Sequence, residues 1–145
     1  MNPSFQSSTL WLLRLSLASA FMSAVIDRLG GWGPPGTPNV AWGAWAPFVG
    51  YTGQLLWFLP ASLVNAAAIG ATLAEAVLAV WLVVGFRLRE AALASAALLL
   101  SFGLSMTLAM GVKAPLNYSV FTAAAAALAL ACLAQPLAAG KRKSR

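Results

Sequence analysis

The sequence predicts an all-α integral membrane protein, a four-helix bundle with an extended aromatic and Gly/Pro-rich loop on its outer side. Of the 145 residues, 61% are hydrophobic and only 8% are charged, whereas about a quarter of the residues of a soluble domain are charged. The mean hydropathy is +0.82. Several apolar runs have the length needed to cross a bilayer core of ~30 Å at 1.5 Å per helical residue. We therefore expect one membrane domain over residues 1–136 and a basic tail at 137–145.

Four runs account for the bundle, and the connections between the last three are short. The expected spans are residues 10–29, 63–86, 91–111 and 116–133. Short connections between helices make consecutive helices antiparallel neighbours. Pro115 lies just before the fourth run, at a position where a helix can begin. Small residues are expected to let the helices approach closely in lipid. They are Ala66, Gly70 and Ala74 in the second span and Ala123–Ala127 in the fourth.

The segment between the first two spans, residues 30–61, differs from the rest of the chain. It holds five of the eight prolines and four of the six tryptophans. Its Gly- and Pro-rich beginning cannot form a regular element. From Trp42 onward, large residues recur at helical spacing, which predicts an amphipathic segment that lies on the membrane or caps the bundle. An irregular aromatic loop packed on the helix ends is the alternative, because Pro47, Gly50 and Gly53 all oppose a long helix.

The basic residues predict the orientation. With both termini in the cytoplasm, seven basic residues lie on the inner side and two, Arg28 and Lys113, on the outer side. This bias follows the positive-inside rule. The expected location is the bacterial plasma (inner) membrane, which the chain crosses several times, with the aromatic loop outside.

Glu75 is the residue that a functional account has to explain. It lies near the middle of the second span, where an ionisable group is costly. Arg14, inside the first span, is its predicted partner, because residue counting places both toward the inner half of the bilayer and paired charges partly offset each other's loss of hydration. Two interpretations stay open. Glu75 and Arg14 either bind a membrane-soluble ligand or a proton, or they are structural and fix the register of the bundle.

A second group of polar residues lies at the expected outer helix ends and in the loop. Its members are Asp27, Arg28, Gln54, Asn65, Lys113, Asn117 and Tyr118. These side chains can converge on one polar pocket beneath the aromatic loop. The alternative is that they are solvated or cap helices, as polar residues at helix ends usually do.

The composition excludes several kinds of chemistry. The chain has no histidine and one cysteine, Cys132, so we expect no metal site, no intrinsic haem or iron–sulfur cluster and no intrachain disulfide. If the protein takes part in redox chemistry, the electrons travel on a bound molecule or on a partner. The net charge is +6, but four of the nine basic residues lie in the tail, which suits an anionic lipid surface rather than nucleic acid.

Three stretches of the chain carry a family resemblance: Phe21–Gly36 with Asn39–Gly43, Tyr51–Gly53, and Lys113–Phe121. Together they resemble the DoxX family. The resemblance extends from Leu13 to about Ala131 and includes Arg14 and Glu75. It implies a four-helix membrane protein related to the small membrane subunit of thiosulfate:quinone oxidoreductase. Gln54 and Asn117 differ from that pattern, in which a lysine and an aspartate are common, and both differences remove charge from the outer rim.

Three functional hypotheses follow, and the sequence does not decide whether the protein is an enzyme. In the first, it is a membrane subunit or quinone-interacting partner of a redox system, with a quinone as the bound cofactor and membrane or membrane-associated redox proteins as partners. In the second, it is a non-catalytic structural or assembly subunit of a larger membrane complex. In the third, it is a small transporter that works as an oligomer.

Overall fold

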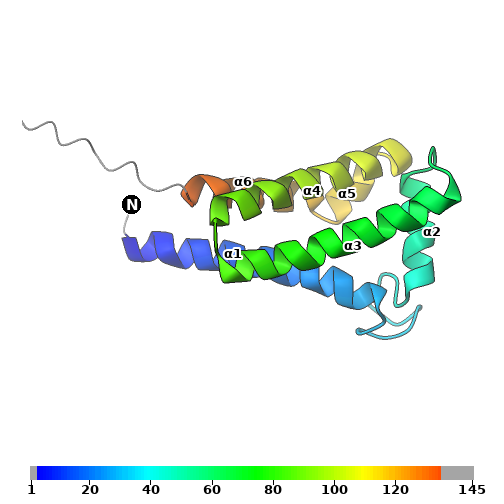
Figure 1. Ribbon diagram of the computed structural model, residues 1–145, viewed down its shortest axis with the longest axis horizontal. Coiled ribbons are helices and arrows are strands. Elements are labelled where there is room, and N and C mark those ends of the chain that lie inside the picture. The colour runs from blue at the N-terminus through cyan, green and yellow to red at the C-terminus, as the bar shows by residue number, and fades with distance from the viewer. Residues whose placement is uncertain (1–2, 135–145) are drawn as a thin grey trace, which may run out of the picture.

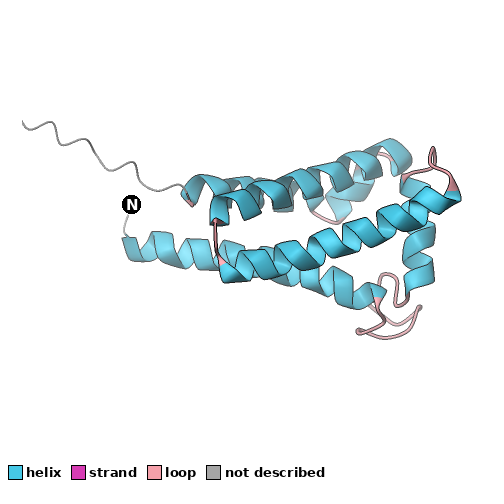
Figure 2. Cartoon of the chain, in the orientation of Figure 1, coloured by secondary structure: helices cyan, strands magenta, loops and turns pink. Residues whose placement is uncertain are grey.

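The structure, a computed structural model, describes residues 3–134. Within that range it is helical and has no strand (Figure 2). The helices are α1 (Pro3–Arg28), α2 (Trp45–Leu55), α3 (Ala61–Val84), α4 (Leu88–Met110), α5 (Lys113–Asn117) and α6 (Val120–Leu133). The predicted all-α class is therefore confirmed. The predicted basic tail lies outside the described residues, and so do four of the seven basic residues on which the predicted orientation depends.

The long helices pack as two pairs (Figure 1). Helix α1 lies along α3, and α4 lies along α6, whereas α3 and α4 contact each other less closely. Helix α2 runs across one end of the bundle and contacts both α3 and α4. The apolar core, which includes Leu17, Leu82 and Leu130, fills the opposite end. The two pairs are therefore joined by side chains at one end and bridged by α2 at the other.

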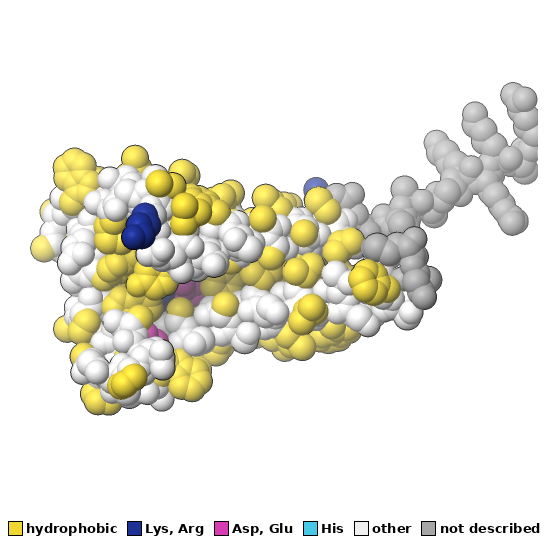
Figure 3. Space-filling view, turned by 180° about the vertical axis from the view of Figure 1, so that it is seen from behind, with side chains coloured by type: hydrophobic (Ala, Val, Ile, Leu, Met, Phe, Trp, Pro, Cys, Tyr) yellow, Lys and Arg dark blue, Asp and Glu magenta, His cyan; other side chains and the backbone are white. Residues whose placement is uncertain are grey.

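Three helices, α1, α3 and α4, are long and apolar enough to cross a membrane. Many large apolar side chains on them point away from the bundle, among them Leu12, Leu73 and Leu108. Apolar side chains are spread over the face seen in Figure 3, and acidic side chains are visible there only inside recesses near the α2 end. Such a surface suits lipid, because an apolar environment carries no penalty for exposed hydrocarbon.

The fourth apolar run is interrupted, which the sequence did not predict. Ser119 adopts a left-handed conformation with φ 54°, and it separates α5 from α6. Helix α6 has 14 residues, so it is about 21 Å long. A hydroxyl side chain that can bond locally is among the few that tolerate such a backbone break. The continuous helix expected over 116–133 is therefore wrong at its beginning.

The aromatic segment contains a helix, as one of the two interpretations expected. Helix α2 begins at Trp45, so Pro47 falls in the first turn, where backbone N–H groups have no partner within the helix and a proline costs little. Phe48 and Thr52, one turn apart, form its buried side. Helix α2 therefore caps the bundle with one face turned inward.

The predicted packing role of the small residues is right for α6 and wrong for part of α3. Ala124 and Ala127 are fully buried in the core of the bundle. Gly70, in contrast, faces open space: a Cβ built on it would meet no atom within 4 Å. Gly103 of α4 is the glycine that does allow close approach, because a Cβ there would lie 2.7 Å from Cε1 of Phe121. The close approach that a glycine allows is therefore the one between α4 and α6.

Two alanine substitutions test this packing. Gly103→Ala should lower the free energy of unfolding by about 1–3 kcal/mol relative to Gly70→Ala, because the Phe121 ring has to move. Gly70→Ala should be neutral or stabilise by up to ~1 kcal/mol, since alanine favours the helix more than glycine. Thermal unfolding in detergent measures both, and equal effects would contradict the assigned packing.

Candidate functional site

A cavity lies between the two helix pairs, beneath α2. Its volume is about 860 Å³. The walls come from α3 on one side, α4 on the other and α2 above, and most of the lining side chains are apolar or aromatic. Gly70, Ala71 and Ala74 form the α3 wall, so the small residues of this helix make room for the cavity. Because the helix pairs contact each other closely only at the far end, this space stays unfilled.

Glu75 lies in the wall of this cavity and pairs with Arg28. Both side chains are buried, at about 5% exposure or less, and Glu75 Oε2 contacts Arg28 Nη1. The same Arg28 nitrogen lies 3.0 Å from Thr72 Oγ1, and the Thr72 hydroxyl donates to the carbonyl of Ala68 at 2.9 Å. Arg28 is the last residue of α1. This contact therefore joins the end of one helix to the middle of its neighbour.

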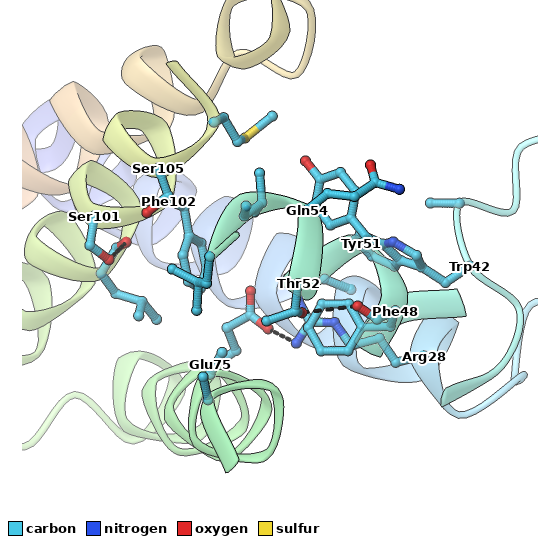
Figure 4. A pocket seen from close by; sticks show the side chains of 18 of the residues that line it. Arg28, Trp42, Phe48, Tyr51, Thr52, Gln54, Glu75, Ser101, Phe102 and Ser105 are labelled. Carbon is cyan, nitrogen blue, oxygen red and sulfur yellow. Dashed lines mark hydrogen bonds and ion pairs between the residues drawn. The ribbon is translucent and has the colours of Figure 1, made fainter. Parts of the chain in front are cut away.

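Aromatic rings from the loop and α2 enclose the Arg28 guanidinium (Figure 4). The guanidinium carbon lies 3.9 Å from the ring centroid of Phe48 and 5.2 Å from that of Trp42. The Trp42 and Phe48 rings meet nearly edge to face, with centroids 5.2 Å apart. A cation over an aromatic face is stabilised electrostatically, by up to about 2 kcal/mol where water is absent. These rings also shield the ion pair from water.

Asp27, the neighbour of Arg28, holds the loop in place. Its carboxylate accepts hydrogen bonds from the backbone N–H groups of Ala41, Trp42 and Gly43 at 3.0–3.3 Å. Gly43 has φ 65°, and a Cβ there would lie 2.6 Å from the carbonyl carbon of Pro34. Only glycine fits this position without strain. Asp27 thus fixes the loop at the point where Trp42 reaches Arg28.

The cavity contains polar groups with unused hydrogen-bonding capacity. Glu75 contacts Arg28 through Oε2, and its other carboxylate oxygen, Oε1, points away from Arg28 into the cavity (Figure 4). Across from it on α4, Ser101 donates to the carbonyl of Leu98 at 2.7 Å, and Ser105 lines the cavity one turn later. Near α2, burial and the neighbouring Tyr118 raise the pKa of the Tyr51 hydroxyl. That hydroxyl therefore stays protonated and able to donate.

The predicted pairing of Arg14 with Glu75 is wrong. Arg14 donates to the carbonyl oxygens of Leu82 and Val83 at the end of α3, at 2.9 and 2.8 Å. Helix ends leave such carbonyls without partners, and a cation stabilises them. Gly85, with φ 77°, ends α3 there, and a Cβ on it would overlap the Arg14 guanidinium. Arg14 therefore caps a helix at the end of the bundle away from the cavity.

The structure brings together only part of the predicted outer rim. Asp27 and Arg28 form the buried cluster just described. Asn65 is exposed and accepts a hydrogen bond from Trp45 Nε1 at 3.3 Å, which ties α3 to α2. Tyr118 is 70% exposed but contributes to the cavity lining. Lys113 and Asn117 are exposed and lie outside that lining. The rim is therefore not one convergent polar pocket.

Several residues of the site carried no functional prediction. Thr72, Trp42, Phe48 and Ser105 are the main ones. Serine and threonine in a membrane helix commonly bond to their own backbone, and aromatic residues are common at the membrane interface. No pattern in the sequence separates these roles from the lining of a cavity. Thr72 is the exception, because its spacing from Glu75, one turn apart on α3, places both on one side of the helix.

Searches against models of protein families, against curated proteins and against solved structures find no match to this chain. Within residues 3–134, no group of three or more His, Cys, Asp or Glu side chains comes together to hold a metal ion.

A double-mutant cycle tests the assigned ion pair. Arg28→Gln and Glu75→Gln should each lower the free energy of unfolding by about 3–5 kcal/mol, because each leaves one buried charge without a partner. The double variant should recover part of this loss, giving a coupling of about 1–3 kcal/mol. Unfolding in mixed micelles with increasing denaturing detergent provides the measurement.

Arg14→Gln is the matched control for this cycle. Its effect should add to that of Glu75→Gln within about 0.5 kcal/mol, because the two side chains bond different partners. A coupling between Arg14 and Glu75 as large as that between Arg28 and Glu75 would overturn the assignment.

Proposed function

We propose that the chain is a DoxX-like membrane protein that binds a quinone-class molecule as a membrane subunit or partner of a redox system. The cavity with Glu75 in its wall is the observation that carries the proposal. Its volume of about 860 Å³ falls within the range of about 300–1,000 Å³ typical of small-molecule sites. A mostly apolar lining with a few polar groups is also typical of such sites.

The membrane arrangement is part of this proposal. We propose four spans in the bacterial plasma membrane, with α5 and α6 together forming the fourth and both termini in the cytoplasm. The exposed residues Arg87 and Arg89 lie where α3 turns into α4, away from α2, which supports placing that end inside. Trp32, Trp57 and Phe58 are exposed around α2, as suits a membrane–water interface. The cavity then lies in the outer half of the membrane.

The position of the cavity favours a ligand that comes from the lipid. It lies between α3 and α4, and its lining includes exposed residues of both helices, Gly70 and Ser101. A flat ring with an apolar tail could place its ring between these helices and leave the tail in the bilayer. With no histidine and one cysteine in the chain, the electrons of a redox reaction would travel on this ligand or on a partner.

A structural or assembly subunit is the second candidate. The observation that favours it is the cluster at the end of α1, where Asp27 holds the loop and Arg28 holds α3. Such contacts fix the arrangement of helices without any ligand. The two candidates differ in one respect: only ligand binding requires the empty space beside Gly70.

Filling the cavity distinguishes the two candidates. Gly70→Leu places a side chain in open space, so it should weaken saturable binding of decylbenzoquinone and its hydroquinone at least tenfold, while the protein still folds. Ala66→Leu is the matched control, because Ala66 is exposed one turn away and lies outside the cavity lining. Equilibrium binding to the protein in lipid nanodiscs measures this.

The binding measurements distinguish a ligand-binding protein from a structural subunit. Saturable binding that Gly70→Leu removes and Ala66→Leu keeps supports a ligand site, and Glu75→Gln should then change the affinity as well. Equal, negligible binding by the wild type and both leucine variants would contradict the quinone proposal and leave the structural subunit as the better account.

A further inference from the structure

Glu75 presents a hydrogen-bond acceptor, and no donor, to the cavity. From this we infer that the ligand of the proposed site carries a hydroxyl donor on its ring, as a hydroquinone or an alkylphenol does, and gives its hydrogen bond to Glu75 Oε1. The inference rests on the proposed function and specifies its ligand. It states that, among ligands with a ring and an apolar tail, the site binds those with a ring hydroxyl more tightly than those without one.

The contact with Arg28 favours the carboxylate form of Glu75. A guanidinium in a protein is always charged, and this one is buried at 3% exposure. The nearest other acid, Asp27, already accepts hydrogen bonds from three backbone N–H groups. A neutral Glu75 would leave the buried cation without a counter-charge, which is strongly destabilising. Oε2 contacts Arg28, so Oε1, which points into the cavity (Figure 4), is the oxygen that remains for a ligand.

A carboxylate oxygen in an apolar wall discriminates between ligands that carry a donor hydrogen at the facing position and ligands that do not. A ring hydroxyl can donate to it and form a charge-assisted hydrogen bond, which is about twice as strong as a neutral one. A quinone carbonyl or a methyl ether at the same place would bring its lone pairs against those of Oε1. Sites built around an unpaired polar group reject analogues that lack the matching partner.

The opposite wall accommodates the rest of the ring. Ser101 and Ser105 lie on α4 across from Glu75 (Figure 4). The Ser105 hydroxyl has no hydrogen bond to any residue that the structure describes, so it can donate to or accept from a second ring oxygen. Phe102 lies between the two walls beside them and offers an apolar surface to the ring. Glu75 is therefore the group that sets the selectivity, because the serines accept either form.

The test uses three ligands that share a six-membered ring, two ring oxygens and a decyl tail. They are decylhydroquinone, its dimethyl ether and decylbenzoquinone, titrated anaerobically into the wild-type protein in lipid nanodiscs. The hydroquinone should bind at least tenfold more tightly than the ether and the quinone. Glu75→Gln keeps the shape of the side chain but removes its charge and offers a donor, so the three affinities should then agree within about threefold. Gly70→Leu should weaken all three.

The wild-type ligand series decides the inference even if the Glu75→Gln variant does not fold. Similar affinities for all three ligands, or tighter binding of the quinone, would overturn the inference while the ligand site itself stands, provided Gly70→Leu removes the binding. Binding of none of the three would overturn the inference and the proposed function together. A tenfold preference that persists in Glu75→Gln would show that another group makes the selection.

Discussion

The contact between Arg28 and Glu75, inside an apolar bundle, is the constraint on which the rest of the site depends. Burying either charge alone would be costly, and together they offset much of that cost only while they touch. The contact fixes the end of α1 against the middle of α3. It also draws the rings of Trp42 and Phe48 over the cation, and Asp27 holds the loop so that they stay there. One ion pair thus positions two helices and the cover of the cavity.

The cavity follows from how the helices pair. Because α1 packs along α3 and α4 along α6, the space between the pairs is filled only where large side chains such as Leu82 and Leu130 meet. At the α2 end, the α3 face is made of small residues, including Gly70, and they leave room. Small residues in membrane helices usually bring helices together. Here they do so on α4 and α6, whereas Gly70 of α3 leaves open space.

The sequence predicts the helical class and Glu75 as the central residue, but not the partner of Glu75. Residue counting placed Arg14 and Glu75 both toward the inner half of the bilayer, and this favoured Arg14. The structure shows α1 starting at residue 3 and Arg14 lying at the end of α3, where it bonds free carbonyls. The break at Ser119 was also missed, because neither hydropathy nor spacing reports a single left-handed residue. The depth of Arg14 and the backbone conformation of Ser119 both depend on tertiary packing, which hydropathy and residue spacing do not report.

A distance between two labelled groups tests the central ion pair most directly. In lipid bilayers, solid-state NMR can measure dipolar coupling between arginine guanidinium nitrogen and glutamate carboxyl carbon. An isotope-labelled Glu90→Gln protein leaves Glu75 as the sole glutamate and removes the exposed Arg87–Glu90 pair. The account predicts coupling from a separation of about 4 Å, kept in Arg14→Lys and lost in Arg28→Lys. No coupling within about 6 Å, or loss of coupling in Arg14→Lys, would contradict it.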